Sequence, residues 1–170
     1  TAINSAASND VLVLANGTYT NNVTLTIGSS SRSGITVRAA TPGGAYLNNI
    51  LAIDITGNNI TFSGFQFTSR TATSGVIITV SGDHNLLTQL NFDGYSAQKY
   101  INLQGQYDEV SYCNFENKPT TAQIGNLIHI APDPSLPGYH KIRYCSFQDM
   151  PGAGGDNGNE CIRISNGTTS

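Results

Sequence analysis

The chain has 170 residues, of which 38% are hydrophobic and 11% charged, and its formal net charge is −3. This length suffices for one domain with a buried core, and the absence of a basic excess argues against nucleic acid or an anionic membrane as partner. No stretch is apolar for the length of a transmembrane helix. Low charge with many Ser, Thr, Asn and Gly residues is typical of a secreted β protein.

The N-terminal part of the chain predicts a cap followed by strands. Residues 1–10 predict a short cap with one helical turn, which would cover an otherwise exposed strand edge. Residues 11–14 predict a buried strand, and residues 23–27 alternate apolar and polar side chains, as a half-buried strand does. Another strand is expected at residues 35–37, after a turn rich in Gly and Ser.

From residue 50 onward, a six-residue pattern that ends in phenylalanine recurs four times. The copies are residues 62–67, 87–92, 110–115 and 142–147, and their phenylalanines are 25, 23 and 32 residues apart. Each copy predicts one strand, and a second, alternating strand belongs to each unit. A β-propeller would need longer repeats, and a sandwich would show no such repeat. The pattern therefore predicts an all-β fold, a right-handed parallel β-helix that forms a single domain over residues 1–170.

Three cysteines and two histidines are expected to have structural roles. Cys113 and Cys145 share one position of the repeat and are predicted to stack inside the core. Two alternatives stay open for them: free thiols that act as small hydrophobes, or a disulfide between adjacent rungs about 4.8 Å apart. Cys161 is also expected in the core. His84 and His140 are expected to be turn or surface residues.

The central residues of the alternating strands are predicted to form one outward column. Its members are Asp54, Thr79, Asn102, His129 and Arg163. Five rungs span roughly 19 Å, the length of a short oligosaccharide. Long loops that end at Lys99, Asn126 and Glu160 are expected to border this face and make it a groove. Outward residues of a solvated sheet are polar in any case, so the column alone does not indicate a function. His129 and Arg163 on adjacent rungs favour a binding role, because they would repel each other unless an anion lies there. The substrate-binding candidates are Arg163, Lys99, His129, Asn102 and Glu160.

Several segments together resemble a known family. They are residues 10–19, 34–44 and 62–67, and the run 140–164, in which a Gly-rich loop precedes Glu160-Cys-Ile-Arg-Ile164. The chain resembles the N-terminal half of the alginate lyase and chondroitinase B family of polysaccharide lyases, over nearly all of its length. Members cleave uronic-acid polymers by β-elimination: a cation, usually calcium, neutralises the carboxylate, and a Lys assisted by an Arg removes the C5 proton.

The resemblance implies a binding role for this chain. In the family, the metal-binding acids and the catalytic Lys and Arg lie after the Glu-x-Ile-Arg-Ile element. The resemblance therefore assigns no catalytic residue and no metal ligand to residues 1–170. Calcium binding is expected only if the coils that follow this element in the family are also present. Substrate binding carries over to Arg163 and, less directly, to Lys99. The polar strand around His129 departs from the family's usual apolar character, which bears on substrate identity.

These observations support three hypotheses for function. The first is the N-terminal part of a secreted polysaccharide lyase that binds an acidic, alginate-like polysaccharide. The second is a non-catalytic carbohydrate-binding β-helix protein, and the third a structural surface protein without a ligand. The domain is expected to be incomplete at its C-terminal end, with a second chain or another copy covering the open coil. Glycosylation sequons start at Asn16, Asn22, Asn59 and Asn166.

Overall fold

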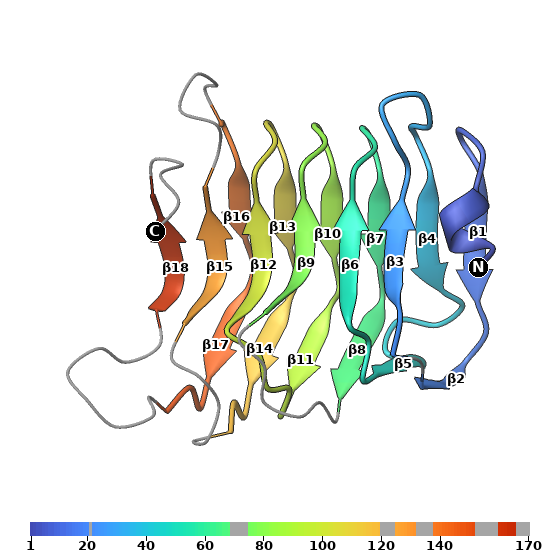
Figure 1. Cartoon of the computed structure of the whole chain (residues 1–170). Coiled ribbons are helices and arrows are strands. Elements are labelled where there is room, and N and C mark those ends of the chain that lie inside the picture. The colour runs from blue at the N-terminus through green and yellow to red at the C-terminus, as the bar shows by residue number, and fades with distance from the viewer. Residues whose placement is uncertain (21, 69–74, 120–124, 132–137, 152–159, 166–170) are drawn as a thin grey trace.

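Parallel strands in three sheets build the whole molecule. The computed structural model describes residues 1–20, 22–68, 75–119, 125–131, 138–151 and 160–165. Each sheet has six parallel strands and takes every third strand along the chain, so one coil contributes one strand to each sheet (Figure 1). The predicted parallel β-helix is therefore confirmed.

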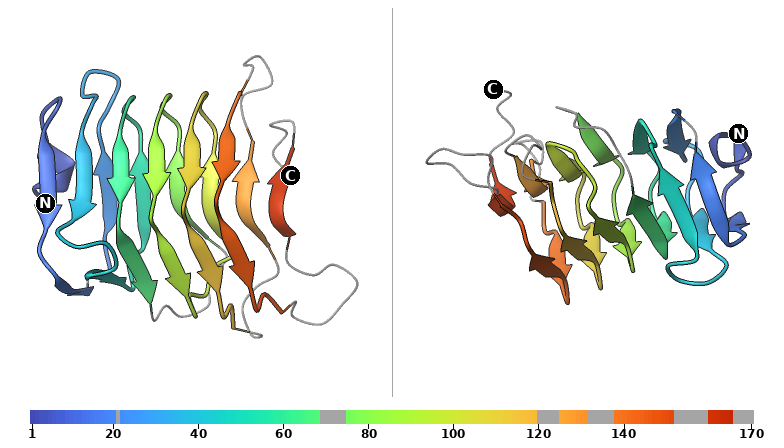
Figure 2. Two further views of the ribbon diagram at one scale, coloured as in Figure 1. Left: turned by 180° about the vertical axis from the view of Figure 1, so that it is seen from behind. Right: turned by 90° about the horizontal axis from the view of Figure 1, so that it is seen from below.

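The three sheets run along the helix axis. Sheet A contains β1 (Val11–Leu14), β4 (Thr36–Ala39), β7 (Thr61–Ser63), β10 (Leu86–Thr88), β13 (Glu109–Ser111) and β16 (Lys141–Arg143). Sheet B contains β2 (Gly17–Thr20), β5 (Ala45–Asn48), β8 (Phe65–Thr68), β11 (Asn91–Asp93), β14 (Asn114–Glu116) and β17 (Ser146–Gln148). Sheet C contains β3 (Thr24–Ile27), β6 (Ala52–Ile55), β9 (Val76–Val80), β12 (Lys99–Leu103), β15 (Asn126–Ile130) and β18 (Glu160–Ile164). Figure 2 shows the coils in order from the N-terminal to the C-terminal end.

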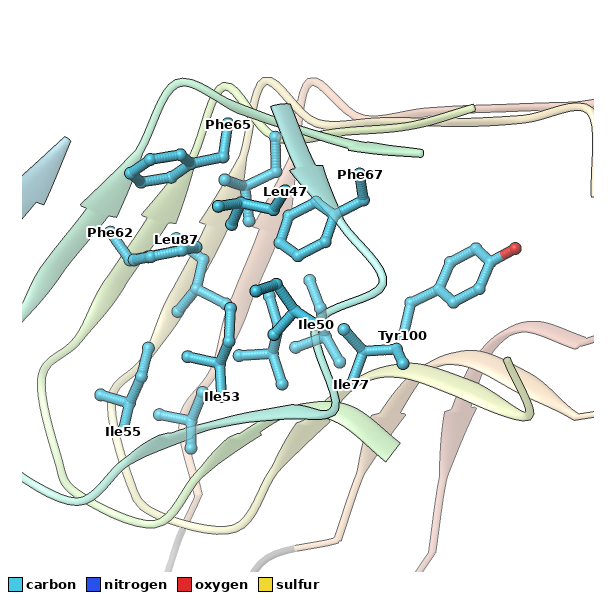
Figure 3. Close-up of a cluster of buried hydrophobic side chains, with 14 of the residues drawn as sticks. Leu47, Ile50, Ile53, Ile55, Phe62, Phe65, Phe67, Ile77, Leu87 and Tyr100 are labelled. Atoms are coloured by element: carbon cyan, nitrogen blue, oxygen red, sulfur yellow. The ribbon is translucent and has the colours of Figure 1, made fainter. Parts of the chain in front are cut away.

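The recurring phenylalanines form a continuous stack inside sheet B. The ring centroids of Phe67 and Phe92 are 4.3 Å apart, those of Phe92 and Phe115 5.2 Å, and those of Phe115 and Phe147 5.0 Å. Near-parallel rings in consecutive rungs add to the energy of burial itself. Aliphatic side chains from sheets A and C, such as Leu87, fill the rest of the interior (Figure 3).

Each six-residue repeat is two short strands and not the one strand predicted. A residue with positive φ separates the sheet A strand from the sheet B strand and turns the chain sharply. The residues at this corner are Gly64, Gln89, Tyr112 and Tyr144, with φ of 79°, 55°, 54° and 55°. Only the glycine signals such a conformation in the sequence, because side-chain-bearing residues rarely adopt it.

Other predictions for the N-terminal coils are partly correct. The cap is confirmed as a 3₁₀ turn, η1 (Ile3–Ser5), whose Ile3 is buried. The strand at 11–14 is present but not buried, because Val11 and Val13 point outward from sheet A and are 62% and 48% exposed. Strands β2 and β5 have no counterpart among the predicted elements.

The prediction for Cys161 is wrong, and that for His140 is correct only in placing it where the chain turns. Cys161 is exposed, because no described coil packs over β18. The His140 side chain is instead 2% exposed and lies inside a corner of the coil. His84 is confirmed as a turn residue, with φ of 57° and its ring stacked on Tyr107.

A ladder of buried polar side chains holds the corner between sheets C and A. Asn85 Oδ1 accepts the Ile60 N–H at 2.8 Å, Asp108 Oδ1 accepts the Asn85 N–H at 2.9 Å, and His140 Nδ1 accepts the Asp108 N–H at 3.3 Å. Each side chain thus satisfies a backbone donor of the preceding coil, where strand pairing is interrupted. A buried donor left without such a partner would cost stability.

The Phe92→Ala variant tests the phenylalanine stack. Phe92 is fully buried between Phe67 and Phe115, so its loss leaves a cavity that its neighbours cannot fill. We expect the free energy of unfolding in chemical denaturation to fall by about 3–5 kcal/mol. Phe147→Ala is the matched control, because Phe147 is only partly buried and should cost less. Equal losses would contradict the stack as the central packing element.

The Asp108→Asn variant tests the polar ladder. Burial raises the pKa of Asp108 to about 7, so the folded carboxyl holds its proton more tightly than the unfolded one. The Asp108 contribution to stability is therefore lost as the pH rises from about 4 to 7, at no more than about 1.4 kcal/mol per pH unit. The unfolding free energy of the wild type, relative to Asp108→Asn, should fall over this range. His140 Nδ1 lies 3.5 Å from Asp108 Oδ2, so the difference reports the coupled titration of the two groups. A difference that stays constant over this pH range would contradict the raised pKa.

Candidate functional site: the outward face of sheet C

The outward side chains of sheet C line up in one row across all six strands. Strand pairing aligns Asp54 with Thr79, Thr79 with Asn102, Asn102 with His129, and His129 with Arg163. The predicted column is confirmed, and Thr26 extends it by one coil. We call these six residues the outer row. Their alignment results from the period of two in each strand, which turns the intervening aliphatic residues inward.

A second row, which we call the entry row, lies at the start of the same strands. Val76 pairs with Lys99, and Asn126 pairs with Glu160. Asn126 Nδ2 donates a hydrogen bond to Glu160 Oε2 at 2.5 Å, and Arg163 Nη1 lies 3.5 Å from the same oxygen. Glu160 therefore connects the entry row to the outer row, and both candidate cations, Lys99 and Arg163, belong to this face.

Two polar atoms of the outer row are buried and have no hydrogen-bond partner among the described residues. They are Asn102 Oδ1 and His129 Nδ1, on adjacent rungs. Asn102 is only 7% exposed although it points outward. A buried polar atom without a partner is costly, and native proteins satisfy most of them. These two atoms therefore have unused hydrogen-bonding capacity, and a ligand on this face reaches them only if the side chains that cover them move.

The surroundings of His129 favour its neutral form. Burial lowers its pKa, the positive charges of Lys99 and Arg163 lower it further, and Glu160 offsets part of this effect. Its Nε2 lies 2.8 Å from Ser165 Oγ. The lowered pKa reduces the positive charge on the imidazole and with it the repulsion expected between His129 and Arg163.

The structure brings all five predicted binding residues to one face. Asn102, His129 and Arg163 lie in the outer row, and Lys99 and Glu160 lie in the entry row. Of the loops expected to border this face, the one that ends at Lys99 is described, and its Tyr95, Ser96 and Ala97 are buried. The loops that end at Asn126 and Glu160 contain residues 120–124 and 152–159, which lie outside the described residues. Sequence reasoning missed Ser165, because it comes after the last alternating position of β18 and has no motif of its own.

Lys118 is a second residue that the sequence reasoning missed. It lies three residues after the repeat phenylalanine Phe115, where the neighbouring coils have Tyr95 and Met150, both packed in or against the core. Lys118 is 2% exposed, its Nζ lies 5.8 Å from the centroid of the Tyr100 ring, and burial lowers its pKa to about 8. A lysine at a repeat position where the neighbouring coils have apolar side chains was the feature of the sequence that could have indicated a buried Lys118.

In the part of the chain that the structure describes, no three His, Cys, Asp or Glu side chains gather as a metal site would require. The expectation that calcium binds only with further coils stays a prediction. Among the described residues, no helix has the length and apolar character needed to cross a membrane.

The sequons fall on the surface wherever they are described. Asn16, Asn22 and Asn59 are exposed, and Asn59 occupies a corner with φ of 55°. Asn166 lies outside the described residues. Exposure permits glycosylation at the first three positions, which stays a prediction.

Comparison with known proteins assigns the family. The sequence profile of the Chondroitinase B family matches residues 1–170. The chain therefore belongs to the Chondroitinase B family and is a polysaccharide lyase-like β-helix. No curated protein sequence matches it.

Solved structures share the fold at low sequence identity. A PL6 alginate lyase in complex with a trisaccharide superposes with a TM-score of 0.79 at 22% identity, over 95% of this chain and 37% of that protein. The alginate lyase AlyF-OU02 gives 0.77 at 22%, over 96% and 37%. A PL6 polysaccharide lyase from Pseudopedobacter saltans gives 0.60 at 15%, over 96% and 49%. The chain thus spans less than half the length of these proteins.

The Arg163→Gln variant tests the electrostatics of the outer row. It removes one of the two positive charges that lower the pKa of His129, so we expect this pKa to rise while burial and Lys99 still hold it below its ordinary value. The change is measured by NMR titration of the imidazole resonances. Lys141→Gln, which removes an exposed charge from sheet A, is the control. A His129 pKa unchanged by Arg163→Gln would contradict the charge coupling within the row.

Proposed function

We propose that this chain is the substrate-binding, N-terminal part of a secreted polysaccharide lyase that acts by β-elimination on a uronic-acid polymer of the alginate type. The observation that carries this proposal is the outward face of sheet C, where Lys99 of the entry row and Arg163 of the outer row flank His129, and where two polar atoms have no partner among the described residues. The family assignment and the likeness to alginate lyase structures support it.

An anionic polymer suits the charge distribution along sheet C. The cations lie on β12 and β18, while the N-terminal part of the outer row carries Thr26, Asp54 and Thr79. Glu160 is the acid next to Arg163, and Asn126 shares its carboxylate. Carboxylates of the polymer would therefore bind at the three C-terminal coils, and a guanidinium binds a carboxylate with more directional hydrogen bonds than an amine.

Sugar hydroxyls suit the remaining polar atoms of the face. Asn102 Oδ1 can accept a hydroxyl hydrogen, and His129 Nδ1 can accept or donate according to its tautomer. Several rungs span roughly the length of a short oligosaccharide. In the reaction we propose, these residues bind and orient the polymer, and none of them is assigned a proton-transfer step.

Binding is tested with guluronate oligosaccharides by isothermal titration calorimetry, with neutral cello-oligosaccharides of equal length for comparison. The Arg163→Gln variant should bind the uronate about 10- to 150-fold more weakly, because a hydrogen bond to a charged group contributes about 1.5–3 kcal/mol. Lys141→Gln on sheet A, a variant with the same loss of charge, should bind as the wild type does. The affinity of the wild type should also fall with added salt.

The outcomes separate the candidate functions. Preferential uronate binding that depends on Arg163, together with unsaturated uronate detected by ultraviolet absorbance in the protein that contains this chain, supports the lyase. The same binding without unsaturated product would instead support a non-catalytic carbohydrate-binding protein. Equal affinity for neutral and acidic oligosaccharides, or no effect of Arg163→Gln, would contradict the binding role of this face.

A further inference from the structure

Cys113 and Cys145 are direct neighbours on consecutive coils. Strand pairing places Val110 beside Ile142 and Asn114 beside Ser146, which brackets the two cysteines, and the Ser146 N–H donates to the Cys113 carbonyl at 3.0 Å. Neighbouring parallel strands lie about 4.8 Å apart, within the range of Cα separations that disulfides span. A bond between the two sulfurs thus needs side-chain rotation but no displacement of the coils.

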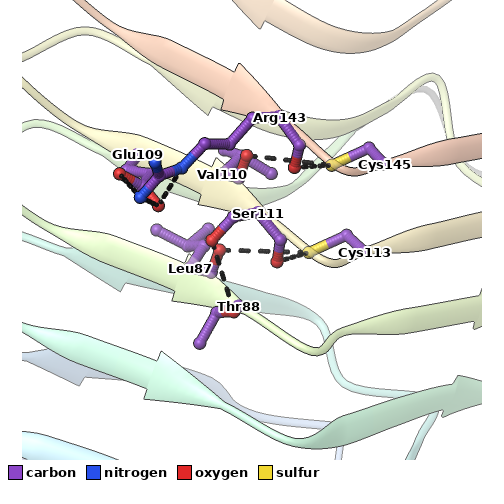
Figure 4. A network of polar contacts seen from close by, with 8 residues as sticks. All are labelled: Leu87, Thr88, Glu109, Val110, Ser111, Cys113, Arg143 and Cys145. Atoms are coloured by element: carbon purple, nitrogen blue, oxygen red, sulfur yellow. Dashed lines mark hydrogen bonds and ion pairs between the residues drawn. The ribbon is translucent and has the colours of Figure 1, made fainter.

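The two thiols have the same orientation. Cys113 Sγ lies 3.3 Å from the Ser111 carbonyl oxygen, and Cys145 Sγ lies 3.5 Å from the Arg143 carbonyl oxygen, the equivalent atom one coil later (Figure 4). Each sulfur also lies near a carbonyl oxygen of the preceding coil, at 3.9 Å and 3.7 Å. Contacts to sulfur at such distances are weak, so rotating the side chains loses little.

The environments of the two thiols differ in a way that suits stepwise exchange. Cys113 is fully buried, whereas Cys145 is partly accessible beside the exposed Tyr144. The interaction between the two thiols, together with burial, raises the pKa of Cys113, whereas the same interaction lowers the pKa of Cys145. The thiolate is the nucleophile in disulfide exchange, so the accessible Cys145 is the attacking group and the buried Cys113 the resolving group.

We propose that Cys113 and Cys145 form a redox-active dithiol that closes to a disulfide by exchange with a low-molecular-weight disulfide of the glutathione type. This modification site is independent of the proposed polysaccharide binding. In the first step, the Cys145 thiolate attacks one sulfur of oxidised glutathione, forms a mixed disulfide and releases glutathione thiolate. In the second step, Cys113 loses its proton and attacks Cys145 Sγ, which releases the second glutathione thiolate. The protein dithiol is oxidised, and one glutathione disulfide is reduced to two thiols, which take up the two protons.

The disulfide would tie two consecutive coils together beside their corner. The chain between the cysteines includes β15, which carries His129, and the coil of Cys145 continues through β17 into β18. Cross-linking removes conformational freedom from the unfolded chain, and the gain grows with the length of the closed loop. Oxidation should therefore stabilise the C-terminal coils against fraying.

The experiment uses the folded protein with the exposed third thiol removed by Cys161→Ser. After incubation with oxidised glutathione without denaturant, the intact mass should fall by two hydrogens, and peptide mapping should show a Cys113–Cys145 link. The Tm should rise by roughly 5 to 10 °C, and dithiothreitol should reverse both changes.

Two single variants test the assigned order of attack. Cys113→Ser should stop at a stable glutathione adduct on Cys145, because the resolving thiol is absent. Cys145→Ser should leave Cys113 unreacted in the folded protein. Circular dichroism verifies that both variants fold, and the wild-type reaction gives a result independent of them. The proposal is overturned if both thiols stay free in the folded wild type, or if the link forms only after unfolding.

Discussion

Hydrogen bonding between parallel strands of consecutive coils is the constraint on which the rest of this structure depends. Because each strand pairs in register with its equivalent in the next coil, a residue's position in the repeat decides its neighbours. The same register stacks Phe92 on Phe115 inside sheet B and places Asn102 beside His129 outside sheet C. Core and binding face are therefore two results of one alignment. An insertion between strands leaves both intact provided that it lies in a loop.

At the corners, side chains must replace the hydrogen bonds that strand pairing provides elsewhere. Pairing stops where the chain turns, and backbone donors there need other acceptors. Asn85, Asp108 and His140 supply them from one coil to the next at the corner between sheets C and A. Glycine serves the same corner by its size alone, since a Cβ at Gly82 would collide with the carbonyl oxygen of Gly57. Buried polar groups in this fold thus continue the hydrogen bonding of the sheets.

Periodicity in the sequence predicts the stacked architecture. It does not predict the sharp bends of the backbone or the contacts that form only between stacked coils. The phenylalanine spacing predicts the stacked coils, and the alternating strands predict the row from Asp54 to Arg163. The bend inside each repeat is missed because Gln89 and Tyr112 give no sign of a positive φ. The surface position predicted for His140 is wrong because its burial depends on Asp108, 32 residues earlier, which becomes its neighbour only once the coils stack.

Stacking also explains how a weakly charged chain can bring two cations to one face. Only 11% of the residues are charged, so ion pairs are sparse, and a few cations can dominate one face. Lys99 and Arg163 come from coils more than 60 residues apart in sequence, yet both act on the pKa of His129 between them. A carboxylate bound there would offset their effect and favour the protonated imidazole, so anion binding and proton uptake at His129 must reinforce each other. If this face binds a polyanion as proposed, the pKa of His129 should therefore rise when the polymer binds.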